Sequence, residues 1–303
     1  MINSNLKASL TSLFDKRVLF DTPMSLYTYF KIGGNADCLV MPSSIDEVLS
    51  VLKLCKSYNT PVTIIGNGTN VLVGDNGIDG VVVQIGEHFS EFSVNDTLIK
   101  AQGGILLSKL AMQAYRLGLS GLEFAAGIPG SLGGGVYMNA GAYGGQLSDV
   151  VIKTKYITMD GELKTAEGSE HQFGYRNSIF CHNQGIVLEC ELELVHGNQE
   201  EMHSKMQEFA RARREKQPLS LPSAGSVFKR PEGMFAGALI EGCGLKGCCI
   251  GGAQVSELHA GFIVNTGGAS ANDVVSLIEH IKEQVLKNCG VELHCEIKMV
   301  GKF

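Results

Sequence analysis

Long apolar runs, an excess of positive charge and paired CxxC cysteines are all missing from this 303-residue sequence. No segment approaches the roughly 18 apolar residues that a membrane-spanning helix needs. A net charge of −6 argues against nucleic acid or a membrane surface as a partner. Nine cysteines without CxxC pairing indicate neither a disulfide framework nor a zinc site. The N-terminus has no apolar leader, so we expect a cytoplasmic protein. We also expect no bound metal and no obligate protein partner.

Strand-like and helix-like patterns alternate along the chain and predict a mixed α+β fold. Ser44, with Glu47 three residues later, is typical of a capping box that opens a helix. Asp160-Gly161 is typical of a hairpin turn. Helices are expected at 44–55, 106–117, 198–216 and 274–286, and strands at 61–65, 71–73, 80–85, 150–159, 185–195 and 255–265.

The composition changes near residue 198, where small apolar residues give way to a polar, charged helical pattern. We therefore expect two domains, at residues 1–197 and 198–303, the first divided further at about residue 62.

Glycine is the abundant residue, with 38 in the chain, and it is concentrated in residues 118–145, where Glu123 is the one charged residue. Such backbone can present several N–H groups to phosphate oxygens. The turn Gly66–Asn70 after a predicted strand offers the same chemistry. Either loop alone is more typical of a flexible connection, but two such loops favour a bound pyrophosphate-containing cofactor.

Two other patterns are weaker. Gly242–Gly247 matches GxGxxG, yet it follows a helix-like stretch and precedes a strand, which is the reverse of a dinucleotide site. Cys243, Cys248, Cys249 and His259 do not have zinc-ligand spacing, and we interpret the cysteines as buried thiols.

Six ordered motifs carry a specific resemblance: Phe30–Ala36, Ile65–Val71, Ala126–Ser131, Asn139–Tyr143, Phe173–Arg176 and Gly225–Lys229. In these the chain resembles the UDP-N-acetylenolpyruvoylglucosamine reductases, the MurB family. The resemblance implies non-covalent FAD in a fold of the vanillyl-alcohol-oxidase (PCMH) type, with a C-terminal substrate domain. It also implies an NADPH-dependent reduction of UDP-N-acetylglucosamine enolpyruvate to UDP-N-acetylmuramate, a step of peptidoglycan synthesis and hence of cell-wall growth and division.

By matching positions, the resemblance implies two FAD loops. The first comprises Gly66, Asn67, Gly68, Thr69, Asn70 and Val71; the second comprises Gly127, Ile128, Pro129, Gly130, Ser131, Gly134, Asn139, Ala140, Gly141 and Ala142.

The same matching implies three catalytic residues, Arg176, Ser226 and Glu296. Arginine and a carboxyl group would handle the substrate carboxylate and its developing charge, and the serine would donate a proton. Taken singly, these residues are more typical of a surface ion pair, a turn and an exposed strand. Their joint order within the matched motifs favours the catalytic interpretation.

Substrate-binding candidates are Tyr175, Arg213, Lys216, Lys229 and Arg230. Arg213 and Lys216 lie three apart on an expected helix and could meet a diphosphate. Arg230 occupies a position where many members of the family carry asparagine. The short segment between Arg176 and Ser226 resembles the type II form, which lacks a substrate-capping insertion.

Two alternatives stay open, a related flavin oxidase that uses oxygen and a non-catalytic module that binds flavin or a nucleotide sugar. Anaerobic reduction of the flavin by NADPH distinguishes the first, and the presence of Arg176, Ser226 and Glu296 disfavours both.

Overall fold

The computed structural model describes residues 2–303. It divides into two compact units. Unit 1 contains the chain up to Phe20, Cys38–Asn67 and Gly80–Ala212, and unit 2 contains Asp21–Asp37, Gly68–Asp79 and Arg213–Phe303. The expected division by sequence order, at residues 1–197 and 198–303, stays a prediction. Within residues 2–303 no helix combines the length and the apolar character that crossing a bilayer requires.

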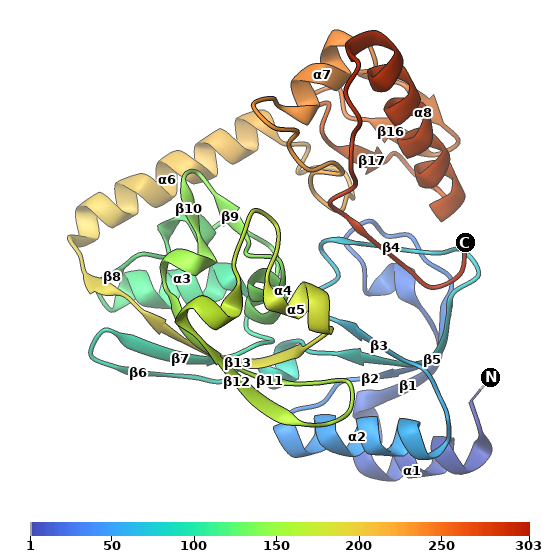
Figure 1. Cartoon of the computed structure of the whole chain (residues 1–303), viewed down its shortest axis with the longest axis vertical. Helices are drawn as coiled ribbons and strands as arrows, with labels where there is room; N and C mark the ends of the chain where they lie inside the picture. Colours follow the sequence, from blue (N-terminus) through green and yellow to red (C-terminus); the bar gives the residue numbers. More distant parts are fainter. Residues whose placement is uncertain (1) are drawn as a thin grey trace. The chain divides into compact units, whose positions relative to one another are not determined.

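The helices and strands alternate along the chain, as expected (Figure 1). The α-helices are α1 (Ser4–Phe14), α2 (Ile45–Ser57), α3 (Leu107–Arg116), α4 (Leu132–Tyr137), α5 (Ile179–Asn183), α6 (Gln199–Lys216), α7 (Ala236–Gly242) and α8 (Ala271–Cys289). The four-stranded sheet has the strand order β1 (Val18–Pro23), β2 (Asn35–Val40), β5 (Ile78–Gln84), β3 (Val62–Ile65). The five-stranded sheet has the strand order β12 (Leu163–Glu167), β11 (Val151–Ile157), β13 (Ile186–Glu193), β7 (Leu98–Gln102), β6 (Phe92–Asn95). The smaller sheets are β9 (Gly141–Ala142) with β10 (Gly145–Gln146), β8 (Leu119–Ser120) with β14 (Val195–His196), β15 (Cys249–Ile250) with β16 (Ala253–Val255) and β17 (Ile263–Asn265), and β4 (Val71–Val73) with β18 (Lys298–Val300).

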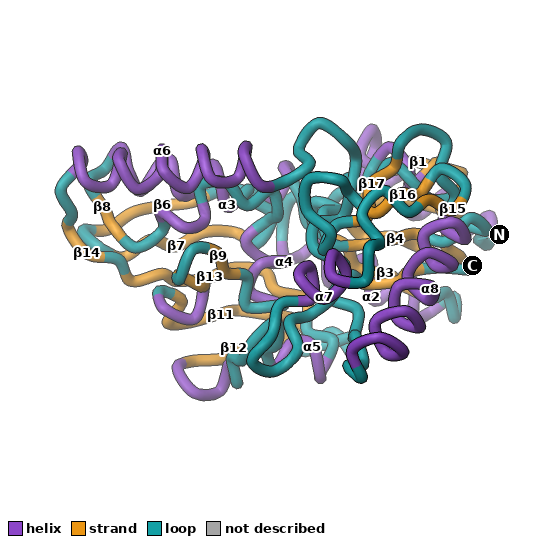
Figure 2. The backbone as a smooth tube through the Cα atoms, turned by 90° about the horizontal axis from the view of Figure 1, so that it is seen from above, coloured by secondary structure: helices purple, strands orange, loops and turns teal. Residues whose placement is uncertain are grey.

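The five-stranded sheet of unit 1 is antiparallel throughout. Helices α3 and α4 lie on one side of this sheet (Figure 1). Their apolar side chains form one buried cluster with those of the sheet. The first part of α6 lies alongside α3 (Figure 2). Between these two helices, Tyr115 and His203 stack with ring centroids 5.6 Å apart. A second cluster joins α1 and α2 to β5 and to the ends of β11 and β13. Unit 1 therefore provides a rigid support for the glycine-rich loops that leave β3 and enter α4.

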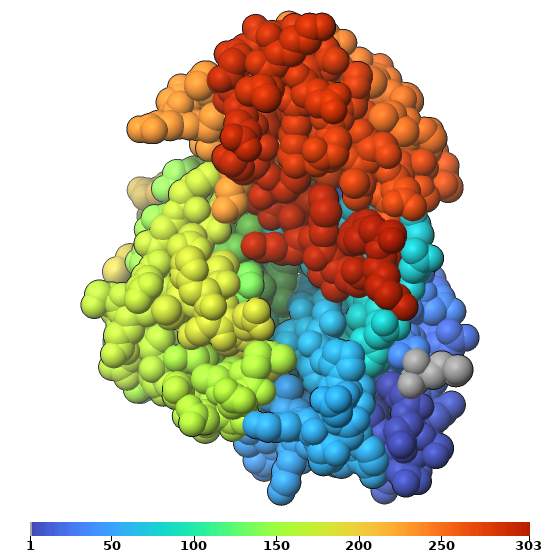
Figure 3. Space-filling view, turned by 45° about the vertical axis from the view of Figure 1, so that its right-hand side comes forward, coloured from blue at the N-terminus to red at the C-terminus, as the bar shows by residue number. Residues whose placement is uncertain are grey.

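Unit 2 is built around α8, whose buried face packs against the β15–β16–β17 sheet and α7. Ser270 and Asp273 form a reciprocal capping box at its start, and Gly290 ends it in a left-handed conformation. The Asp75 carboxylate accepts hydrogen bonds from the Ala271 and Asn272 N–H groups at 2.7 and 3.0 Å. Figure 3 shows the part of unit 2 beyond Arg213 in orange to red.

Candidate active site

The two predicted cofactor loops meet in unit 1. Asn67 Nδ2, after β3, donates a hydrogen bond to the Pro129 carbonyl at 2.7 Å. Gln84 Nε2 reaches the neighbouring Gly66 carbonyl at 3.4 Å. Behind the second loop, Leu107 N–H donates to the Gly130 carbonyl at 3.0 Å. Loops far apart in sequence are thus held side by side by their own backbone and amide groups.

Ser131 is the clearest sign that this place takes a ligand. Its hydroxyl is buried and has no hydrogen-bond partner among residues 2–303. A Cβ at Gly66 would lie 2.5 Å from that oxygen, so a side chain there would fill the space in front of it. Buried hydroxyls are normally hydrogen-bonded. A phosphate oxygen could accept from Ser131, so the residues present fit the pyrophosphate of FAD.

The second cofactor loop continues into the β9–β10 hairpin, whose two-residue turn is Tyr143-Gly144, both with positive φ. A tight turn, closed by hydrogen bonds between Gly174 and Asn177, lies against this hairpin. Arg176 belongs to that turn, has φ of 52°, and donates from Nη2 to the Gly141 carbonyl at 3.2 Å. The structure therefore brings a predicted catalytic residue onto a predicted cofactor loop.

The remaining residues of the first loop, Gly68 to Val71, lie in unit 2. Gly68 has φ of 65° and packs directly against the backbone of Tyr27, which leaves no room for a side chain. Asn70 Nδ2 lies 3.4 Å from the Glu296 carbonyl, and β18 then pairs in parallel with β4. The C-terminal segment thereby places Glu296 beside the end of a predicted cofactor loop.

The backbone segments that carry Ser226 and Glu296 pair with each other in unit 2. The Val227 N–H donates to the Gly261 carbonyl, and the Glu296 N–H donates to the Val227 carbonyl at 2.7 Å. The segment carrying Ser226 is consequently held between two other segments, one of them carrying Glu296. Glu296 is only 8% exposed and precedes β18, so it is not a solvent-facing strand residue.

The substrate candidates differ in their surroundings. Tyr175 is 50% exposed, and its ring lies 5.3 Å from the Arg176 guanidinium carbon. In unit 2, Lys229 is partly buried, whereas Lys216 and Arg230 are exposed. Arg213 Nε is buried and makes no hydrogen bond within the described part of the chain, so it can still donate to a ligand.

The cysteine interpretation needs correction. Cys249, the first residue of β15, is exposed. Cys243, which caps α7, and Cys248, just before β15, are only partly buried at the edge of the unit 2 core. Among residues 2–303 no group of three or more metal-binding side chains was found.

Sequence reasoning missed a buried polar group behind the Arg176 turn. The His171 side chain is fully buried, its Nε2 lies 2.9 Å from Thr154 Oγ1, and its ring stacks on Phe173 at 4.7 Å. Burial lowers the pKa of this histidine. His171 lies in a charged stretch that is typical of an exposed turn, so the sequence contains no signal for it.

The chain is similar to known families and proteins over nearly its whole length. Residues 36–167 match the model of an FAD binding domain, and residues 217–300 match that of the UDP-N-acetylenolpyruvoylglucosamine reductase C-terminal domain. UDP-N-acetylenolpyruvoylglucosamine reductases from Clostridioides difficile (strain 630) and Alkaliphilus oremlandii (strain OhILAs) are 46% and 49% identical, covering 100% and 94% of both chains. The crystal structure of the Thermus caldophilus reductase matches with a TM-score of 0.80 and 34% identity, over 93% of this chain and 98% of that one.

Proposed function

The chain belongs to the UDP-N-acetylenolpyruvoylglucosamine reductase family, and on that basis we propose how its residues carry out the family's reaction. It is a flavin-dependent oxidoreductase that reduces UDP-N-acetylglucosamine enolpyruvate to UDP-N-acetylmuramate in peptidoglycan precursor synthesis. The predicted α+β fold with an FAD-binding domain is confirmed. FAD held by the two glycine-rich loops would supply the redox chemistry, which is hydride transfer from NADPH to the substrate. We also propose a cytoplasmic location, where NADPH is available and the nine cysteines stay reduced.

FAD is held, in this proposal, by the two glycine-rich loops. Ser131 donates its unpartnered hydroxyl proton to a phosphate oxygen, and Gly66 keeps the space before it open. Backbone N–H groups of the loops supply further donors. Arg213 Nε, together with Lys216 and Lys229, is proposed to bind the substrate's diphosphate.

Three side chains act on the substrate. Arg176 pairs with its carboxylate, which fixes the orientation of the enolpyruvyl group. Negative charge develops on the carbon beside that carboxylate, and Glu296 contributes to stabilising it. Ser226 then donates the proton that completes the lactyl ether.

The pairing of the two backbone segments that carry Ser226 and Glu296 supports this assignment. The Glu296 N–H donates to the Val227 carbonyl at 2.7 Å, so the backbone of Glu296 is bound to the residue that follows the proposed proton donor. Two groups held by backbone bonds keep their geometry without reorganisation during the reaction, which is what makes such donors effective.

Ser226→Ala tests the assignment. We expect FAD reduction by NADPH within about twofold of the wild type, and reoxidation by enolpyruvate substrate slowed about 100- to 10,000-fold, because only the proton donor is lost. Both half-reactions are followed at the flavin absorbance by anaerobic stopped flow. Ser223→Ala, in the same segment, is the matched control. Equal losses in both half-reactions would contradict the proton-donor role. In a separate aerobic run of the wild type, reoxidation by oxygen but not by the enolpyruvate substrate would favour a flavin oxidase.

A further inference from the structure

Asn139 has a side chain whose polar atoms are all engaged inside the protein. The residue is 2% exposed. Its Oδ1 accepts the Ser148 N–H at 2.9 Å. Its Nδ2 lies 3.2 Å from Gln146 Oε1, 3.4 Å from Ser148 Oγ and 3.1 Å from the Gly174 carbonyl. An amide has two N–H donors, so three acceptors already exceed its capacity, and no donor is left for a cofactor.

The contact with Gly174 is the one that leads to the active site. Gly174 and Asn177 close the turn with hydrogen bonds of 3.0 and 3.3 Å, and the second of these ends on the Gly174 carbonyl. The same carbonyl accepts from Asn139. Asn139 therefore anchors the first residue of the turn that carries Arg176.

A second bond joins the same two segments in the opposite direction. Arg176 Nη2 donates to the Gly141 carbonyl at 3.2 Å, two residues beyond Asn139. The hairpin and the turn are thus linked both through a buried amide and through the guanidinium itself. Loss of the amide leaves the guanidinium attached to a turn that is no longer fixed at its start.

We propose that Asn139 is a positioning residue that fixes the orientation of Arg176, and that its side chain does not contact FAD. The inference rests on the proposed carboxylate-binding role of Arg176. It also explains why the residue is asparagine: φ of 46° is tolerated by asparagine, and the side chain can donate and accept at once.

Two substitutions separate the side chain from the backbone. Asn139→Asp keeps the shape and the acceptor for Ser148 but cannot donate to Gly174. Asn139→Gly keeps the positive φ and removes the side chain. For both we expect FAD content and the NADPH half-reaction within about twofold of the wild type. The reoxidation by substrate should slow about 10- to 100-fold, since small misplacements of an orienting group have effects of that size.

Gln146→Ala is the matched control, because it removes another partner of the same amide and leaves the Gly174 bond. We expect it to react within about twofold of the wild type. Thermal unfolding checks that each variant is folded. Loss of FAD from Asn139→Gly would overturn the proposal. Wild-type reoxidation by Asn139→Gly would also overturn it, and any defect of Asn139→Asp would then be due to the added charge.

A double-mutant cycle with Arg176→Ala identifies the route of the effect. If Asn139 acts through Arg176, adding Asn139→Asp to Arg176→Ala should slow reoxidation by no more than about threefold. A full additional loss would overturn the proposal. An Arg176→Ala variant with wild-type reoxidation would instead refute the proposed role of Arg176, so the two failures give different results.

Discussion

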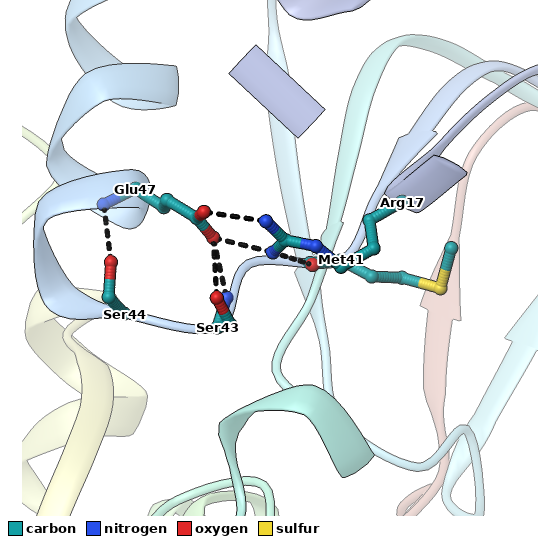
Figure 4. Close-up of polar contacts among 5 residues, drawn as sticks. All are labelled: Arg17, Met41, Ser43, Ser44 and Glu47. Atoms are coloured by element: carbon teal, nitrogen blue, oxygen red, sulfur yellow. Dashed lines mark hydrogen bonds and ion pairs between the residues drawn. The ribbon is translucent and has the colours of Figure 1, made fainter. Parts of the chain in front are cut away.

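Replacing Glu47 by glutamine tests how strongly one ion pair holds the N-terminal part of unit 1 together (Figure 4). Arg17 approaches the carboxylate with two nitrogens, Nη1 to Oε2 and Nη2 to Oε1, each at 2.6 Å. The Ser43 N–H adds a third donor at 2.7 Å. These bonds connect the start of α2 to the residue that precedes β1. We expect Glu47→Gln to lower the free energy of unfolding, because the amide cannot replace the paired charge.

The pKa of the Glu47 carboxyl group sets the size of the expected loss in unfolding free energy. Its pKa is lowered from 4.5 to about 2, chiefly by the hydrogen bonds from Arg17. A shift of this size corresponds to about 3 kcal/mol at about 1.4 kcal/mol per unit. The Arg17 and Glu47 side chains are 26% and 18% exposed, so solvent screens the pair. We therefore expect a loss of about 1–2 kcal/mol.

The same pKa shift determines how the stabilisation by Glu47 changes with pH. Because the folded-state pKa is depressed, the carboxylate stabilises the protein fully above about pH 4.5, and this stabilisation is lost as the pH falls toward 2. Urea unfolding followed by circular dichroism, from pH 7 to pH 3, should show the wild type and Glu47→Gln converging at low pH. Asp46→Asn, in the same exposed first turn of α2, is the control for charge alone. A difference below about 0.3 kcal/mol at pH 7, or one that does not change with pH, would refute the reasoning.

Two further predictions concern stability and reactivity. Asp75→Ala removes the acceptor for the first two N–H groups of α8. We expect it to lower the free energy of unfolding by about 1–2 kcal/mol, measured as a lower Tm. An unchanged Tm would show that Ser270 caps the helix sufficiently. Burial raises the pKa of the Cys190 and Cys55 thiols to about 12 and about 11. At pH 8, iodoacetamide should therefore label exposed Cys249 and leave Cys190 and Cys55 unlabelled, as measured by peptide mass spectrometry. Labelling of all three at similar rates would contradict this.

Elements whose signals are local could be predicted from the sequence. Helices α3 and α8 form where apolar residues recur at helical spacing, and the Asp160-Gly161 turn joins β11 to β12. Each depends on side chains within a few residues of one another. The strand expected over 255–265 was wrong in its middle, because β16 ends at Val255 and the chain turns before β17. An apolar run alone does not reveal such a turn.

Only half of the capping box predicted at Ser44 and Glu47 is present, because a distant residue binds the Glu47 side chain. Ser44 accepts the Glu47 N–H as predicted, at 3.2 Å. The Glu47 side chain, however, binds Arg17 and the Ser43 N–H instead of returning to Ser44. A charged guanidinium forms stronger hydrogen bonds with a carboxylate than a neutral backbone amide does. The partner lies 30 residues away, so no local motif could predict it.

The Arg176 turn shows the same limit at the proposed site. Its motif could be found in the sequence, but its left-handed φ of 52° could not, since arginine rarely adopts it. Such a conformation costs on the order of 1–2 kcal/mol and persists only where surrounding contacts hold it. Here those contacts include the Asn139 bond to Gly174 and the Arg176 bond to Gly141. A strained backbone held from two sides directs the guanidinium in one orientation, and that is the property that carboxylate binding requires.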